Sequence, residues 1–122
     1  MERLLLYVEP TPGMARATDW ALKTAQHWGS RVFAVSVLDT KAARNPAEDA
    51  EEQAWEALYE IEDDAFRQNI RISLLLEQGD PLQRVLSLAA NYDIELVVFG
   101  ADTRLNAAEL VRRAARPLVF VR

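Results

Sequence analysis

Short apolar runs alternate along the chain with longer amphipathic stretches, and this alternation predicts the secondary structure. Five runs are apolar at nearly every position, as is typical of parallel strands that are covered on both faces. We expect these strands at residues 3–8, 31–38, 70–77, 94–100 and 118–121. The fourth run ends at Gly100 and a polar loop follows it. This loop is the first place to look for a ligand site, because open α/β sheets bind ligands at the carboxyl ends of their strands.

Four helices are expected between the strands, and turn residues mark their ends. The first helix ends before Gly29, which suits a left-handed C-terminal cap. Residues 45–48, 80–83 and 106–109 each have the pattern of a helix N-terminus, in which Asn or Asp caps the helix and a Glu or Gln reaches back. The apolar stripes that we expect to be buried contain Met14, Ala17, Ala21, Leu22, Ala25 and Trp28; Ala50, Ala54, Trp55, Leu58, Ile61, Ala65 and Phe66; Leu82, Val85, Leu86 and Ala89; and Ala107, Leu110, Val111 and Ala114.

The alternation of strands and helices predicts one α/β domain that covers residues 1–122. Right-handed crossovers between successive strands give an open, mostly parallel five-stranded sheet with helices on both faces, which is a Rossmann-like architecture. A chain of 122 residues, of which 50% are apolar, is long enough to form its own core.

Composition narrows the function classes. The chain has no cysteine, which excludes disulfides, thiolate metal sites and thiol nucleophiles. Its net charge of -5 disfavours nucleic acid and anionic membranes as partners. No stretch approaches the roughly 20 apolar residues that span a bilayer, and the N-terminal apolar run is too short for a secretory signal. We therefore expect a cytoplasmic protein with neither nucleic-acid nor membrane partners.

Several segments, taken together and in this order, resemble the universal stress protein family over essentially the whole chain. The first is the apolar strand that ends at the acidic residue Glu9. The others are residues 25–29 (AQHWG), 79–81 (GDP), 94–100 (IELVVFG) and 114–122 (AARPLVFVR). The combination of these segments and their spacing carry the resemblance.

The resemblance implies a sheet order of 3-2-1-4-5 and a crevice between strands 1 and 4. The candidate ligand-binding residues at this crevice are Glu9, Thr11, Asp39, Gly100, Asp102, Thr103 and Arg104. It also implies a homodimer, because family members commonly pair the terminal strand across a two-fold axis. The expected interface is Leu118, Val119, Phe120 and Val121. This strand is uncharged and β-prone, so it would be a hazard if it lay uncovered at a sheet edge.

The phosphate-binding motif of the family's nucleotide-binding members is incomplete in this chain. Those members have Gly-x-x-Gly after the fourth strand and, about nine residues later, Gly-Ser or Gly-Thr, so that N–H groups, a hydroxyl and a helix N-terminus hold phosphate. Only Gly100 matches, because Thr103 takes the second glycine position and no glycine follows Gly100. Glu9, Asp39 and Asp102 add negative charge, and Glu9 replaces the family's usual Asp. We expect that tight ATP binding is lost and that no cofactor is needed.

The sequence does not favour metal binding or catalysis. The three strand-end carboxylates could bind Mg²⁺ or Mn²⁺, which prefer oxygen ligands, but no metal-binding spacing is present, so we expect no metal site. His27 is the only histidine and has no nucleophile partner in the sequence, so we expect no enzyme activity. Asp80 is explained as a helix cap. The acidic residues between 48 and 64 are typical of a solvated helix face, with a cation-binding or DNA-mimicking surface as the alternative.

Two functions remain open. The first is a universal stress protein-like regulator that acts through dimerisation and through contact with a regulatory protein partner, without tight ATP binding. The second is a module that binds an adenine nucleotide, ATP or AMP with Mg²⁺, or another small molecule in the crevice between strands 1 and 4.

Overall fold

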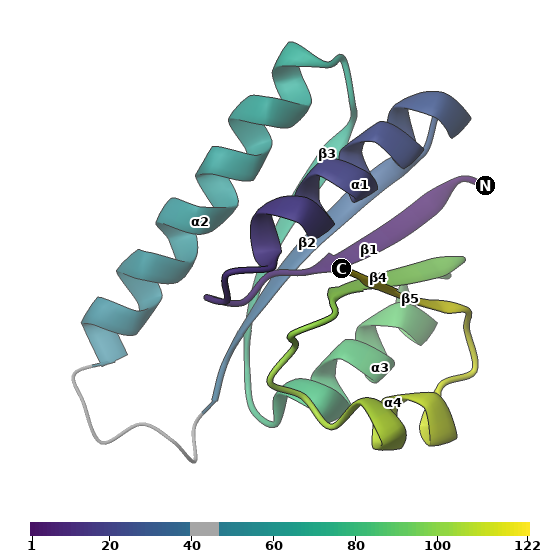
Figure 1. The fold of residues 1–122 in the computed structure, drawn as a ribbon. Helices are drawn as coiled ribbons and strands as arrows, with labels where there is room; N and C mark the ends of the chain where they lie inside the picture. The colour runs from purple at the N-terminus through teal and green to yellow at the C-terminus, as the bar shows by residue number, and fades with distance from the viewer. Residues whose placement is uncertain (40–46) are drawn as a thin grey trace.

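Strands and helices alternate strictly along the chain (Figure 1). The computed structural model describes residues 1–39 and 47–122. Its strands are β1 (Arg3–Tyr7), β2 (Arg31–Leu38), β3 (Ile72–Gln78), β4 (Leu96–Gly100) and β5 (Leu118–Val121). Its helices are α1 (Met14–Trp28), α2 (Ala47–Arg67), α3 (Pro81–Asn91) and α4 (Ala107–Arg113). The predicted cap of α2 at Asn45 lies outside the described residues.

The strands form one parallel sheet in the order β3-β2-β1-β4-β5. β1 lies at its centre, where Leu5 is paired with Phe33 of β2 and with Val97 of β4. The predicted α/β class is confirmed, as is the strand order that the family resemblance implied. Because the strands are parallel, the carboxyl ends of β1, β2 and β4 meet at one edge of the sheet, and the loops that follow them are neighbours.

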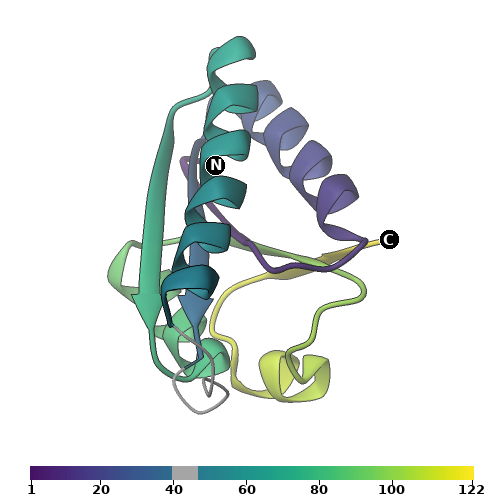
Figure 2. The same ribbon diagram turned by 90° about the vertical axis from the view of Figure 1, so that its left-hand side faces the viewer.

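Alternate residues of β1 supply the two halves of the core. Leu4 and Leu6 pack with α1 and α2 on one face of the sheet, whereas Leu5 and Tyr7 pack with α3 and α4 on the other (Figures 1 and 2). The three leucines are fully buried, and each stabilises the fold by roughly 1.5–3 kcal/mol through leaving water. The central strand is therefore held from both sides, as its unbroken apolar run predicted.

Local signals in the sequence set the helix ends. Gly29 has a φ of 66° and ends α1 in the predicted left-handed cap. Asp80 accepts a hydrogen bond from the Gln83 N–H at 3.1 Å, and Asn106 accepts one from the Glu109 N–H at 3.0 Å. The Glu109 carboxylate accepts a hydrogen bond from the Arg112 guanidinium at 2.7 Å. Its side chain therefore pairs with the next turn of α4, whereas the sequence pattern predicted that it would reach back to Asn106.

Two predicted strands begin later than expected because their first apolar residue belongs to a helix cap. The N–H groups of Ile70 and Ile94 donate to the carbonyls of Ala65 and Ala89, each at 2.9 Å. The residues before them, Asn69 and Asp93, have positive φ angles of 58° and 51°. These are the bonds and the left-handed residue of a Schellman cap, in which the following apolar side chain packs back on the helix. β3 consequently starts at Ile72 and β4 at Leu96.

Five residues that we expected in the buried stripes are exposed, namely Trp28, Ala50, Phe66, Ala107 and Val111. The two alanines lie in the first turns of α2 and α4. Trp28, Phe66 and Val111 expose 60%, 64% and 63% of their surface. Trp28 and Phe66 lie in the last turns of their helices. Val111 follows Leu110, and in a helix as short as α4 Leu110 alone is fully buried. In the part of the chain that the structure describes, no helix is long and apolar enough to cross a membrane.

Candidate functional site

The loop that follows β4 crosses the carboxyl edge of the sheet and bonds to the segment that follows β1. The Arg104 N–H donates to Glu9 Oε1 at 2.9 Å, and the Arg104 guanidinium donates to the Pro10 carbonyl at 3.0 Å. The family resemblance placed Glu9 and Arg104 at one crevice, and the structure brings them into direct contact. A backbone N–H and a side chain of Arg104 thus join the ends of β4 and β1 directly.

Asp102 lies in the space that two glycines leave. The Gly13 N–H, at the N-terminus of α1, donates to Asp102 Oδ2 at 2.8 Å. A Cβ atom on Gly13 would lie 2.4 Å from Asp102 Oδ1, and one on Gly100 would lie 2.9 Å from that atom. A side chain at either position would therefore displace the carboxylate. Its negative charge lies where the positive end of α1 favours an anion.

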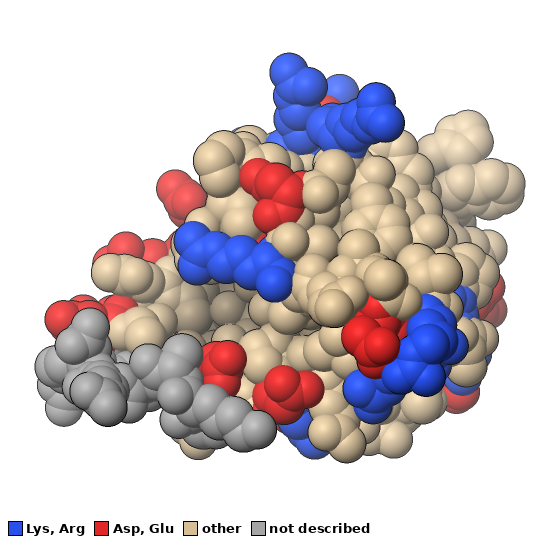
Figure 3. Space-filling view, turned by 60° about the horizontal axis from the view of Figure 1, so that its bottom comes forward, with Lys and Arg blue, Asp and Glu red and all other residues tan. Residues whose placement is uncertain are grey.

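The polar groups of Thr103 bond within the loop that follows β4. The Thr103 N–H donates to the Gly100 carbonyl at 3.0 Å, and the Thr103 hydroxyl accepts from the Leu105 N–H at 3.3 Å. In a phosphate cradle such groups would point toward the ligand. The nearby acidic side chains are spread over this end of the molecule in several separate places (Figure 3).

A groove of about 1400 Å³ lies beside this loop, between α1 and α2 and above the ends of β1 and β2. Three of the predicted site residues line it, namely Glu9, Thr11 and Asp39. The four from the β4 segment, Gly100, Asp102, Thr103 and Arg104, do not. The structure thus divides the predicted site into a closed loop contact and an open groove.

Glu9 belongs to both parts. It exposes only 6% of its surface, and Oε1 is held by the Arg104 N–H. Glu9 Oε2 is buried and has no hydrogen-bond partner among the described residues, and the same is true of Thr11 Oγ1. A buried carboxylate oxygen without a partner is costly, because it has lost its hydration without replacement. Two residues that line the groove therefore each carry a buried acceptor without a partner among the described residues.

Sequence reasoning missed the part of this groove that α2 contributes. Its wall includes Gln53, Glu60 and Asp63, and the two acidic residues belong to the face that the sequence favoured as solvated. Gln53 and Glu60 are seven residues apart, and Glu60 and Asp63 are three apart. This helical spacing places all three along one border of the apolar stripe of α2, and it is the signal that could have found them. Gly13, the partner of Asp102, was also missed, because nothing in a Pro-Gly turn shows which carboxylate its N–H will bind.

Within residues 1–39 and 47–122, no three histidine or carboxylate side chains are grouped so that they could hold a metal ion. His27 lies in the last turn of α1, with its ring edge-on to the ring of Trp28 at 5.3 Å. It does not line the groove.

Tyr7 lies at the end of β1 with only 5% of its surface exposed. Burial raises the pKa of the Tyr7 hydroxyl far above its usual value of 10.0, and the negative charges of Glu9 and Asp39 raise it further. The carboxylates at this edge therefore act on the core as well as on the groove, because they help to keep the Tyr7 ring neutral.

We expect the stability of the protein to fall with pH above about 10, because Tyr7 ionises in the unfolded chain and stays neutral in the folded one. Each further pH unit then favours unfolding by about 1.4 kcal/mol from this residue. Tyr7→Phe should remove that part of the slope in urea unfolding series between about pH 8 and pH 11. Tyr59 and Tyr92, which are exposed, remain in both proteins. Equal slopes for the two proteins would contradict the assignment.

Both the sequence and the fold of the chain are similar to those of known proteins. The model of the universal stress protein family matches residues 1–122. A search of curated proteins finds no significant match. Among solved structures, a protein of this family from Burkholderia pseudomallei is 21% identical over 98% of this chain and 95% of that chain, with a TM-score of 0.81.

Two further solved structures are described with a bound nucleotide. The universal stress protein from Archaeoglobus fulgidus in complex with dAMP is 21% identical over 100% of this chain and 98% of that chain, with a TM-score of 0.81. A family protein from Arabidopsis thaliana with AMP bound is 14% identical over 100% of this chain and 92% of that chain, with a TM-score of 0.77. At these identities the likeness shows a common fold.

Proposed function

Because the chain belongs to the universal stress protein family, we propose that it is a stress-response regulator that acts as a cytoplasmic homodimer and does not bind ATP tightly. In this proposal, β5 joins two copies of the chain and a regulatory protein partner receives the signal. No catalytic step, cofactor, nucleic acid or membrane takes part.

The observation that carries the proposal is that the loop between β4 and α4 is already bonded to other parts of the protein. The Asp102 carboxylate is bonded to the Gly13 N–H, and the Arg104 N–H is bonded to Glu9. A triphosphate placed at this loop would meet a carboxylate where it needs N–H donors, and repulsion would oppose it. Helix α4 starts at Ala107 and has seven residues. Its first turn carries Glu109, whose negative charge would also oppose a phosphate at this helix N-terminus.

Thermal unfolding in the presence of Mg-ATP tests the proposal. A nucleotide present at 100 times its Kd would stabilise the fold by about 2.7 kcal/mol, which raises the Tm of a domain of this size by several degrees. We expect no shift beyond that of Mg²⁺ alone at millimolar Mg-ATP. A saturable rise in Tm, reproduced as heat in isothermal titration calorimetry, would refute the absence of tight ATP binding.

A second candidate function is the binding of a nucleoside monophosphate. Glu9 Oε2 and Thr11 Oγ1 are buried acceptors without partners in the described part of the chain, and an amino group of a nucleobase is a donor that fits them. Proteins of similar fold are described with AMP, dAMP and cAMP. AMP and cAMP therefore belong in the same thermal series. A shift with AMP but none with Mg-ATP would favour this candidate.

A further inference from the structure

We propose that the groove between α1 and α2 binds a linear aliphatic polyamine, a molecule whose ammonium groups are separated by short alkyl chains. The groove is a different surface from the β4 loop, and the proposal does not depend on whether the protein binds ATP.

The first argument is the buried carboxylate of Glu9 in the lining of the groove. Glu9 lines the groove and exposes only 6% of its surface, while its Oε2 atom has no hydrogen-bond partner among the residues that the structure describes. None of the ion pairs within residues 1–39 and 47–122 includes Glu9. A buried negative charge is stable only when it is paired, and an ammonium group supplies both the opposite charge and the N–H donors. Thr11 Oγ1 offers a second acceptor beside it.

The second argument is the charge of the groove wall. Seven acidic side chains line the groove against one basic side chain, that of Arg67, among the described residues. Arg67 is itself paired with Asp64, so its charge is compensated on the surface of α2. Asp19 has a partner in Lys23, at 3.0 Å. Glu60 and Asp63 add further negative charge along α2. An anionic ligand is repelled by this wall, and a cationic one is attracted to it.

The third argument is the apolar floor. Val8, Met14, Leu22 and Ile61 line the groove between the acidic positions. An inorganic cation gains nothing from such a surface and keeps its own water. A polyamine places methylene groups on it, and each CH₂ group that leaves water there adds to the affinity. The floor therefore favours an organic cation with alkyl segments over a metal ion.

The shape of the groove selects an elongated molecule. Its lining residues run along α2 from Asp49, near the start of the helix, to Gln68, just after its end. At the far end the Gln26 amide donates to the Gln68 carbonyl at 3.0 Å and joins the ends of α1 and α2. The carboxylates are distributed along this length and do not converge on one point, so several separated positive charges match them better than a single metal ion.

Isothermal titration calorimetry with spermidine tests the proposal on the full chain. We expect saturable binding that weakens as the salt concentration rises. Glu9→Gln removes the charge and keeps an oxygen that can accept from the Arg104 N–H. Losing the charged hydrogen bond should weaken spermidine binding about ten- to a hundredfold. Glu60→Gln should weaken it by a smaller factor.

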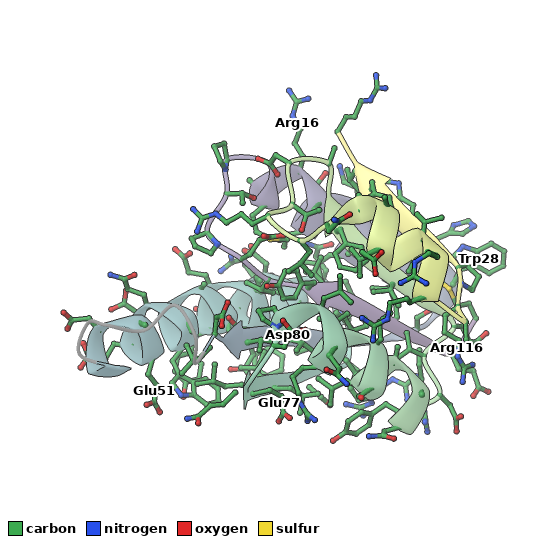
Figure 4. All side chains as sticks on the ribbon, turned by 90° about the horizontal axis from the view of Figure 1, so that it is seen from below. Arg16, Trp28, Glu51, Glu77, Asp80 and Arg116 are labelled. Atoms are coloured by element: carbon green, nitrogen blue, oxygen red, sulfur yellow. The ribbon has the colours of Figure 1, made fainter. Side chains whose placement is uncertain are left out.

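Glu51→Gln is the matched control for Glu60→Gln. It also removes one negative charge from α2, but at a position that does not line the groove. Glu51 is exposed and lies on the side of α2 away from α1 (Figure 4). Its substitution should leave spermidine binding unchanged. Equal weakening by Glu51→Gln and Glu9→Gln would overturn the proposal, because attraction by net charge alone would then explain the binding. If Glu9→Gln fails to fold, the contrast between Glu60→Gln and Glu51→Gln decides.

Two small-molecule controls separate the contributions. The neutral chain 1,8-octanediol should bind far more weakly than spermidine, and Mg²⁺ should not displace spermidine beyond the effect of equal ionic strength. Absence of saturable spermidine binding, or full competition by Mg²⁺, would overturn the polyamine site. Neither result bears on the proposed absence of tight ATP binding, which the Mg-ATP series tests by itself. Spermidine binding would count against the nucleoside monophosphate candidate, because both ligands would use the same Glu9 and Thr11 acceptors.

Discussion

Phe99→Ala should lower the free energy of unfolding by about 3–5 kcal/mol, which is the loss typical of a fully buried aromatic residue. Phe99 lies in β4 with none of its surface exposed. Its ring contacts that of Phe120 in a stacked arrangement at 5.3 Å and that of Tyr7 at 5.9 Å. The substitution therefore leaves a cavity among three strands. Since whole domains are stable by only about 5–15 kcal/mol, this one change removes a large share of the total.

Phe66→Ala is the control for that experiment, because Phe66 exposes 64% of its surface. Its substitution should change stability by no more than about 0.5 kcal/mol. Chemical denaturation followed by circular dichroism measures both variants. A loss below about 1 kcal/mol for Phe99→Ala would mean that the core on the α3 and α4 face repacks around the cavity.

The fold could be predicted from the sequence because its main signals are periodic and local. Unbroken apolar runs indicated the buried strands, and Gly29, Asp80 and Asn106 marked helix ends that the structure has. The errors at the strand starts have a common cause. Ile70 and Ile94 are apolar residues next to strands, yet their N–H groups close the preceding helices. Apolar character shows that a residue is buried, and only the chain path shows which element it belongs to.

The candidate site was less predictable, for a geometric reason. Parallel topology brings Glu9 and the β4 loop to one edge, so their proximity followed from the strand order. The groove depends instead on the separation of α1 and α2, which the spacing of apolar residues in each helix does not fix. Whether Glu9 Oε2 has a partner depends on side-chain placement at the scale of an ångström. Such a detail leaves no trace in a sequence pattern.

The edge of the sheet at β5 leads to the second large expected effect. The Pro117 and Val121 carbonyls accept from the β4 segment, at 3.0 Å from the Val97 N–H and at 2.7 Å from the Ala101 N–H. Alternate residues of a strand direct their polar backbone groups to opposite sides, so those of Leu118 and Phe120 point away from β4. The strand has no charged side chain, whereas the other edge strand, β3, contains Glu77. Exposed edges without charges invite pairing with another chain.

Val119→Lys should convert the proposed homodimer into a monomer. Val119 is half-buried in the middle of β5 and is paired with Val98 of β4. Antiparallel pairing of two β5 strands about a two-fold axis would bring the two lysines close together, and like charges on paired strands are destabilising. Size-exclusion chromatography with light scattering should give twice 13.8 kDa for the unchanged chain and 13.8 kDa for the variant.

Val111→Lys supplies the control, since Val111 is exposed on α4 and lies outside β5. It introduces the same charge and should leave the mass at the dimer value. Circular dichroism must show that Val119→Lys retains its helices, because a lysine at a half-buried position also perturbs the fold if its ammonium group cannot reach water. A monomeric mass for the unchanged chain, or a dimeric mass for folded Val119→Lys, would contradict pairing through β5. A dimer that survives Val119→Lys would instead have to use another surface, and the part of α1 beside β5, which carries the exposed Trp28, is the next one to substitute.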